Sequence, residues 1–320
     1  MKNGEYLIPV GMTEFARDTA FSFSSSDLTK WCEERSRGRY RAGDITVISP
    51  EELRGLDYAG ILAKLMRVHD FGKVVVNGAD DLDAEVFAAA LFLAMRAGRE
   101  FLIRSAAGLV RVLAGIPKQP PLKRGELCLG DSLSGGLVIV GSHVQKTTEQ
   151  LECLLASGMD LEPVCFRTEP VFRPAGLQEE SGRVLRIAEA AIRSGRTAVV
   201  YTSRQVLRSR EESSQDNLRL SVQISRSLTS VVKNLAVRPS FLVAKGGITS
   251  YDVGIWGLGV RRAWVMGQAA PGVPVWRTGE ESRFPHMSYV IFPGNVGDKD
   301  TIRTVVQMLA GRTEADGRPL

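Results

Sequence analysis

The stretch Phe241–Val260, FLVAKGGITSYDVGIWGLGV, decides the fold. Its first four residues are apolar and typical of a buried strand, which ends at Lys245. The glycine pair Gly246–Gly247 follows, then Thr249 and Ser250, and after them the apolar residues recur at helical spacing. Glycines between a strand and a helix are typical of a phosphate site, because they let a phosphate approach the backbone near free N–H groups. The same pattern also forms plain turns, so this stretch leaves both interpretations open.

The strand–helix alternation around this stretch continues through the C-terminal part of the chain. Apolar runs predict strands at 137–140, 163–166, 197–201, 241–244, 262–266, 273–276 and 289–292. Segments with helical periodicity lie between these strands, at 147–157, 181–194, 218–235 and 250–258, and another follows the last strand, at 299–309. Repeated strand–helix units predict an open, mostly parallel sheet covered by helices.

The N-terminal part has the same alternation in a shorter form. Strands are predicted at 43–49, 73–77 and 100–104, with a helix from Pro50 to about His69 and another to about Arg96 that Asp81 or Asp83 caps. Residues 117–136 (PKQPPLKRGELCLGDSLSGG) are rich in Pro, Gly and charge, which indicates a linker. We therefore expect an α/β protein of two domains, 1–116 and 137–320, each with a mostly parallel sheet flanked by helices.

Composition limits the class of protein. Of the 320 residues, 44% are apolar and 24% charged, which is typical of a globular protein. The longest apolar run, Val86–Met95, is too short to cross a bilayer, and the N-terminus has no apolar segment of a signal peptide. The four cysteines have neither zinc-site nor disulfide-frame spacing. The sequence therefore predicts a cytoplasmic protein that does not bind membranes.

The charge pattern bears on the partners. The net charge is +5 and the pI about 9.1, but Arg and Lys are scattered, without the basic stripe and aromatics of a nucleic-acid binder. We expect no nucleic-acid partner, whereas an anionic small molecule suits this balance.

Other strand ends carry small or hydroxyl residues as well. Gly141 and Ser142 follow one predicted strand, residues 202–204 (Thr-Ser-Arg) another, and residues 293–298 (PGNVGD) a third. Because the carboxyl ends of parallel strands meet at one edge of a sheet, together they favour a nucleotide or phosphate pocket. Neither the Walker pattern nor a G-x-G-x-x-G or G-x-S-x-G motif occurs.

Other candidate groups have weaker support. His69, His143 and His286 are too far apart in sequence to predict a metal triad. Three aspartates, Asp80, Asp81 and Asp83, follow a predicted strand, where they either bind substrate or metal or only cap the next helix.

Several long motifs, in this order, resemble the four-carbon acid sugar kinase family. In the C-terminal part they are GSHVQKTTEQLECLL, VVYTSR, FLVAKGGITSYDV, LGVRRAWVMGQAAPGVPVW and YVIFPGNVGD. In the N-terminal part they are EFARDTAFSFSSSDL, VVVNGADDLDAEVF and FLIRSAAGLVRVLAGI, which resemble the later part of that family's substrate-binding domain. The resemblance covers nearly the whole chain.

The resemblance implies an ATP-dependent kinase of four-carbon sugar acids such as threonate, erythronate or 3-oxo-tetronate, with Mg²⁺ accompanying the ATP. Residues 1–116 would then be part of the sugar-acid-binding domain, and residues 137–320 the nucleotide-binding domain. The implied nucleotide-binding residues lie in three loops: Ser142, Gly246, Gly247, Thr249, Ser250, Gly294, Asn295 and Gly297.

The chain also departs from the family pattern. The Asp-Asp-x-Thr-Gly-Ala loop and the Lys-x-Asp-Ser-Thr-type segment, which carry substrate contacts and the general base, do not occur, and Ile248 replaces an acidic residue. The chain is therefore expected to be an incomplete or split kinase, served by a second chain, or a non-catalytic protein that binds nucleotide or sugar acid. An unrelated α/β enzyme acting on an anionic metabolite is a third interpretation. The catalytic residues, the substrate-binding residues, the sugar acid used and a homodimer remain open, and no metal ligand is predicted.

Overall fold

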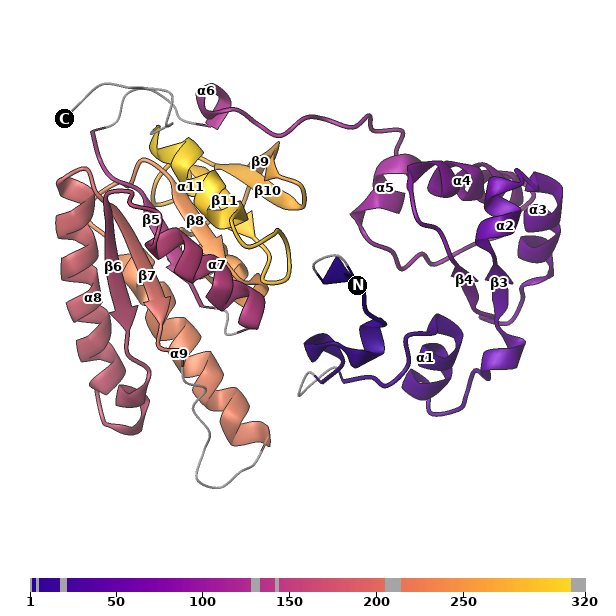
Figure 1. The fold of residues 1–320 in the computed structure, drawn as a ribbon, viewed down its shortest axis with the longest axis horizontal. Helices are drawn as coiled ribbons and strands as arrows, with labels where there is room; N and C mark the ends of the chain where they lie inside the picture. The colour runs from indigo at the N-terminus through magenta and orange to yellow at the C-terminus, as the bar shows by residue number, and fades with distance from the viewer. Residues whose placement is uncertain are drawn as a thin grey trace. The chain divides into compact units, whose positions relative to one another are not determined.

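A computed structural model of the chain describes residues 2–3, 6–17, 22–127, 133–141, 144–204 and 214–311 (Figure 1). The chain divides into two compact units, Met1–Lys118 and Gln119–Leu320. The division falls inside the predicted linker, 117–136. Within that segment, Leu122 donates its N–H to Gln268 O at 2.8 Å and Leu127 is buried in the core of the second unit, so residues 122–127 pack with that unit.

The first unit is built on two short parallel strands, β3 (Thr46–Ile48) and β4 (Val74–Val76). The helices that follow them bury a single apolar core, which includes Ile48, Ile61 and Leu91. These helices are α2 (Pro50–Arg54), α3 (Tyr58–Arg67), α4 (Asp81–Arg96) and α5 (Ala107–Leu113). The N-terminal residues add β1 (Lys2–Asn3) antiparallel to β2 (Tyr6–Leu7), α1 (Leu28–Arg35), and the 3-10 turns η1 (Val10–Met12), η2 (Glu14–Arg17) and η3 (Ala42–Asp44).

Three local predictions in this unit are wrong. The predicted helix from Pro50 to His69 is two helices, because Leu56 has a left-handed backbone (φ 55°) and Asp57 caps a new helix by accepting from Gly60 N. The predicted strand at 100–104 is irregular and its Leu102 is fully exposed. The cap of α4 is Asp80, which accepts from Asp83 N at 3.0 Å, and neither Asp81 nor Asp83.

The second unit contains a seven-stranded sheet in the order β6-β7-β5-β8-β11-β10-β9. The first five strands in that order are parallel, as predicted. The last two, β9 and β10, form an antiparallel hairpin at the edge. In chain order the strands are β5 (Leu137–Val140), β6 (Leu161–Phe166), β7 (Thr197–Thr202), β8 (Leu242–Lys245), β9 (Ala263–Ala270), β10 (Val273–Thr278) and β11 (Ser288–Phe292).

Both faces of this sheet are buried, which explains why its strands are continuous apolar runs. Alternate residues of β5 show the division, since Leu137 and Ile139 face one core while Val138 and Val140 face the other. The first core is covered by α8 (Gly176–Arg193), α9 (Ser214–Asn234) and the π-helical turn η5 (Val253–Gly257), which continues α10 (Gly247–Asp252) (Figure 1). The second is covered by α7 (Gln145–Leu155), α11 (Thr301–Ala310) and the short α6 (Arg124–Leu127). A 3-10 turn, η4 (Glu169–Phe172), precedes α8.

The strand order creates a switch point in the middle of the sheet. Strands β5 and β8 are neighbours, yet the helix after β5 covers one face and the helical segment after β8 covers the other. Such a divergence opens a crevice at the carboxyl ends of the two strands, where ligands of open α/β sheets bind. No helix within the described residues has the length and apolar character that crossing a membrane requires.

Candidate nucleotide site

The strand-end residues singled out in the sequence converge at the carboxyl edge of the second unit's sheet. Gly141 follows β5 and donates its N–H to Lys245 O at 3.3 Å. Gly246 follows β8 and donates its N–H to Phe292 O, at the end of β11, at 2.8 Å. The ends of β5, β8 and β11 are therefore adjacent. Ser142, predicted to belong to the first loop, lies outside the described residues.

The start of α10 has an open, uncapped N-terminus. Gly246 adopts φ 117°, a conformation that L side chains rarely reach, and no side chain caps the helix. A Cβ at Gly247 would meet no atom within 4 Å, so open space lies in front of this residue. The first turn of a helix leaves N–H groups without an intrahelical acceptor, and these are available to an anion here.

The two hydroxyl residues of this turn are largely buried and face the protein. Thr249 packs against Gly141, where a Cβ would come within 2.2 Å of Thr249 Oγ1. Ser250 donates its hydroxyl to Ala244 O at 2.7 Å. The side chains hold the loop against the strand ends, so the donors directed at a ligand would be backbone N–H groups.

Lys245, at the end of β8, organises the loop after β11, a role that no sequence pattern indicated. Its side chain is fully buried, and Nζ donates to Pro293 O at 2.7 Å, to Gly294 O at 3.3 Å and to Val296 O at 3.4 Å. Nζ also lies 4.1 Å from the centre of the Phe292 ring. Burial, and secondarily the charge of Lys146, lower the pKa of Lys245 to about 7.

Two further side chains hold the same loop from α7. The sequence spacing of Thr147 and Gln150 is that of a capping box, but Val144 is the N-cap of α7 and makes no side-chain bond. Thr147 Oγ1 donates to Gly294 O at 3.1 Å, and Gln150 Nε2 donates to Val296 O at 3.1 Å and to Asp298 O at 2.7 Å.

The direction of these carbonyls fixes the direction of the loop's N–H groups. In a planar trans peptide, the C=O of one residue and the N–H of the next point opposite ways. Inward carbonyls at Pro293, Gly294 and Val296 therefore turn outward the N–H groups of the residues that follow them, Gly294, Asn295 and Gly297. Within the described residues, no hydrogen bond uses these three N–H groups. Successive outward N–H groups form an anion-binding concavity.

Charged and hydroxyl side chains also lie at the carboxyl ends of β6 and β7, on the same edge of the sheet. Glu180, almost fully buried on α8, pairs with Arg167 at 2.9 Å and with Arg183 at 2.5 Å. Burial alone would raise the pKa of Glu180, but the hydrogen bonds from the two guanidinium groups outweigh it and hold the pKa at about 2. After β7, Ser203 bonds Thr168 Oγ1 through its hydroxyl at 2.5 Å. These contacts brace the strand ends.

Comparison with known families places these loops in context. A family model described as a nucleotide-binding C-terminal domain matches residues 137–302, and one described as a sugar-binding N-terminal domain matches residues 4–113. The chain belongs to the four-carbon acid sugar kinase family. The resemblance inferred from the motifs is thereby confirmed, and the loops after β5, β8 and β11 all lie within the nucleotide-binding match.

Solved structures show the fold of this kinase-family chain in relatives of low identity. One is a Salmonella typhimurium LT2 protein provisionally named a tRNA synthase, with a TM-score of 0.57 and 15% identity over 92% of this chain and 66% of its own. Another is protein HI1011 of Haemophilus influenzae, with a TM-score of 0.51 and 16% identity over 93% of this chain and 68% of its own. This chain thus spans about two thirds of their length. A comparison with curated proteins finds none that matches.

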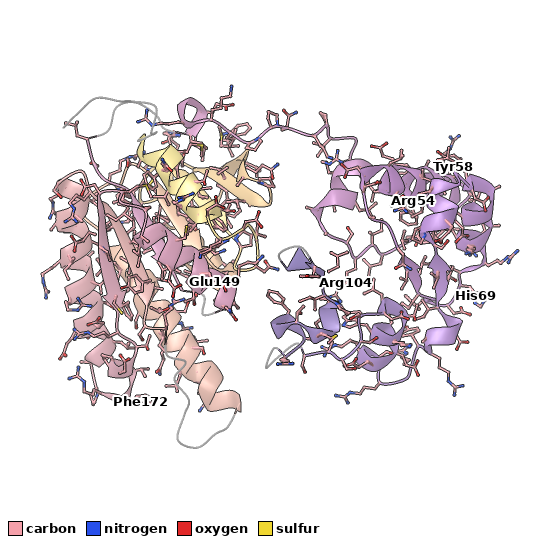
Figure 2. The ribbon with its side chains drawn as sticks, in the orientation of Figure 1. Arg54, Tyr58, His69, Arg104, Glu149 and Phe172 are labelled. Carbon is pink, nitrogen blue, oxygen red and sulfur yellow. The ribbon has the colours of Figure 1, made fainter. Side chains whose placement is uncertain are left out.

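The aspartates of the sugar-binding match take structural roles in the first unit. Asp80 caps α4, and Asp83 accepts from Ala79 N at 2.7 Å and lies 3.6 Å from Arg54 of α2, labelled in Figure 2. Asp81 pairs with Arg111 at 2.9 Å and with Lys118, and the hydrogen bonds from these two cations lower its pKa. Across the described part of the chain, no three His, Cys, Asp or Glu side chains gather into a metal-binding cluster.

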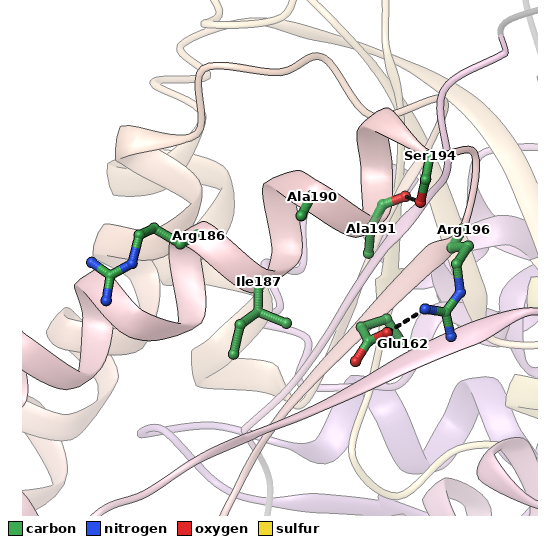
Figure 3. A pocket seen from close by; sticks show the side chains of 7 residues that line it. All are labelled: Glu162, Arg186, Ile187, Ala190, Ala191, Ser194 and Arg196. Carbon is green, nitrogen blue, oxygen red and sulfur yellow. Dashed lines mark hydrogen bonds and ion pairs between the residues drawn. The ribbon is translucent and has the colours of Figure 1, made fainter.

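One surface hollow of the second unit lies away from the candidate edge. Its volume is about 390 Å³, and Figure 3 shows it between α8 and the start of β6. Arg196, just before β7, crosses it to Glu162 at 2.5 Å. This hollow lies toward the amino ends of the strands, so it is separate from the loops described above.

Proposed function

We propose that this chain is an ATP-dependent kinase of a four-carbon sugar acid of the threonate, erythronate or 3-oxo-tetronate type. The observation that carries the proposal is the pair of loops after β8 and β11. Both expose backbone N–H groups at one switch point, and a phosphate chain needs such donors.

The two loops would divide the phosphate contacts. The first turn of α10 would supply N–H groups from Gly247, Ile248 and Thr249, and the open space at Gly247 leaves room for a phosphate oxygen. The loop after β11 would supply the N–H groups of Gly294, Asn295 and Gly297. Ser250 would take part through its position in the turn, since its hydroxyl is bonded to Ala244 O.

Mg²⁺ would accompany the nucleotide at this site. The ion neutralises phosphate charge during phosphoryl transfer and commonly keeps several waters and phosphate oxygens as ligands. Because the described residues contain no cluster of three metal-binding side chains, we expect the phosphates and water to supply most of its ligands. The chain's own N–H donors would position the phosphates for attack by the substrate hydroxyl.

The acceptor would bind to the unit that matches the sugar-binding domain. Sugar acids carry one carboxylate, which suits the net charge of +5. A second candidate function, binding of nucleotide or sugar acid without transfer, is favoured by the aspartates after β4, because each of them has a structural partner instead of an open carboxylate.

Calorimetry and turnover in the same sample test the proposal. Purified chain is titrated with ATP and Mg²⁺, and ADP release is then followed with threonate, erythronate and 3-oxo-tetronate in turn. Binding followed by ADP release with one sugar acid supports the kinase. Binding without release with any of them supports the non-catalytic alternative, and absence of ATP binding contradicts both nucleotide-dependent functions.

A matched pair of variants separates site effects from folding effects. Gly247→Val places a side chain in the open space before α10, whereas Gly108→Val adds the same side chain to α5 of the first unit, where a Cβ also meets no atom within 4 Å. Loss of ATP binding in the first variant alone locates the phosphates at α10.

A further inference from the structure

The loop after β11 depends on one charged side chain for its shape. Lys245 donates to the oxygens of Pro293, Gly294 and Val296 from a fully buried position. Thr147 and Gln150 bind part of the same loop, but each is neutral and neither reaches Pro293 O. Hydrogen bonds from a charged donor are the stronger ones, so Lys245 contributes most to the inward orientation of the carbonyls.

We infer that Lys245 is a positioning residue for nucleotide binding, because its ammonium holds three carbonyls of the loop inward and so aims the N–H groups of Gly294, Asn295 and Gly297 at the phosphates. This inference rests on the proposed nucleotide binding. Lys245 itself is fully buried and would not touch the ligand.

The number of donors explains why the charged form is required. An ammonium has three N–H donors, which matches three carbonyl oxygens. The neutral amine has two N–H donors and a lone pair, so one of the three carbonyls would lose its Lys245 donor and face a lone pair. Each carbonyl keeps one other donor: Val296 N for Pro293 O, Thr147 Oγ1 for Gly294 O and Gln150 Nε2 for Val296 O. A lone pair that faces a carbonyl oxygen repels it, so the peptide can rotate and its N–H then turns away from the phosphate.

The charge state of Lys245 changes within an accessible pH range. Its pKa is lowered to about 7 by burial and, secondarily, by Lys146 of α7. The side chain that packs against it from β11, Phe292, carries no charge. Among the described residues, Lys146 is therefore the charged neighbour whose removal can shift the pH midpoint at which Lys245 loses its proton.

The first experiment measures ATP–Mg²⁺ affinity from pH 6 to pH 8.5 for wild type, Lys245→Met and Lys146→Met. Wild-type affinity is expected to fall by about tenfold, or ~1.4 kcal/mol, as the pH rises through 7. Lys245→Met is expected to bind weakly at every pH without this step. Lys146→Met is expected to keep the step but with a higher midpoint, because a like charge has been removed. Titration of the nucleotide is common to all three proteins and cancels in the comparison.

A second measurement needs no nucleotide. Hydrogen–deuterium exchange at pH 6.5 is compared for wild type and Lys245→Met over residues 293–300, where Val296 N is bonded to Pro293 O and Asp298 N to Thr301 Oγ1. Faster exchange confined to this segment is the expected result.

The outcomes separate the two proposals. If wild type binds no ATP at any pH, the proposed function fails, while the exchange experiment still tests the role of Lys245 in the loop. If wild type binds ATP with the same affinity from pH 6 to pH 8.5, or if Lys245→Met binds as wild type does, the inference is overturned. If Lys245→Met does not fold, the inference is tested by comparing the pH midpoints of ATP affinity in wild type and Lys146→Met. Identical midpoints in these two proteins also overturn the inference.

Discussion

Gly141 and Thr249 are packed so closely that a Cβ on the glycine would lie 2.2 Å from Thr249 Oγ1. The end of β5 thus contacts the first turn of α10, although the two residues are far apart in sequence. Only glycine fits at position 141, because real Cβ atoms do not approach other heavy atoms so closely. The contact sets the distance between the loops after β5 and β8.

Gly141→Ala tests this contact. We expect the overpacking to lower the free energy of unfolding by about 1–3 kcal/mol and to weaken ATP binding by displacing α10. Thr249→Ala removes the clashing Oγ1, so the double variant should recover part of the loss. Urea denaturation and calorimetry of the two single variants and the double variant measure this coupling, and purely additive effects would contradict the direct contact.

Gly247→Val tests the open space before α10. Because a Cβ there meets nothing within 4 Å, the free energy of unfolding should stay within about 1 kcal/mol of wild type. The side chain would fill the space proposed for a phosphate, so ATP binding should be abolished. Calorimetry on the folded variant checks this, with Gly108→Val as control, and unchanged ATP affinity would show that phosphates do not approach Gly247.

Sequence patterns predicted the parallel part of the fold because its strands are buried on both faces. A run such as LVIV at 137–140 has no other common explanation once helices flank it. Periodicity carries no information on strand direction, so the antiparallel hairpin of β9 and β10 was not predicted as such. The apolar residues at 101–103 suggested a strand, but exposure of Leu102 depends on tertiary packing that the sequence does not display.

The sequence identified the glycines of the candidate site but not the side chains that hold its loops in place. Gly246 needs a backbone conformation that few other residues reach, so it marks the turn directly. Lys245 looks like an ordinary charged strand end, and its role depends on Pro293, 48 residues later in the chain. Gln150 has the sequence spacing of a local cap with Thr147, yet its partners Val296 and Asp298 lie 146 and 148 residues away. Local spacing cannot identify such partners.

Glu180→Gln tests the charged brace between β6 and α8. The variant leaves Arg167 and Arg183 without their carboxylate, and we expect the free energy of unfolding at pH 7 to fall by about 1–3 kcal/mol. The pKa of Glu180 is about 2 in the folded chain, below its ordinary value of 4.5. Its stabilising effect is therefore complete above about pH 4.5 and is lost as the pH falls from there toward 2.

Denaturation of wild type and Glu180→Gln at pH 7 and pH 3 measures this dependence. The difference between the two proteins should shrink at the lower pH. Glu179→Gln is the matched control, because Glu179 is exposed and the substitution removes only its ion pair with the exposed Arg173, whose nitrogen lies 3.6 Å from the carboxylate. A difference that is as large at pH 3 as at pH 7 would contradict the assignment of the effect to the carboxylate charge.

Tyr289→Phe tests how α10 is tied to the sheet. The buried Tyr289 of β11 donates its hydroxyl to Ser250 O at 2.5 Å, and burial raises the pKa of this phenol well above its usual range, so the hydroxyl stays a donor. Phenylalanine keeps the edge-on ring contact with Trp276, whose centroid is 6.3 Å away, and removes only the hydrogen bond. We expect the free energy of unfolding to fall by about 1 kcal/mol, because Ser250 O is left buried without this donor.

Tyr251→Phe, at an exposed position of the same helix, is the control and should leave stability unchanged. Equal effects of the two substitutions in thermal unfolding would show that the hydrogen bond to Ser250 does not anchor α10.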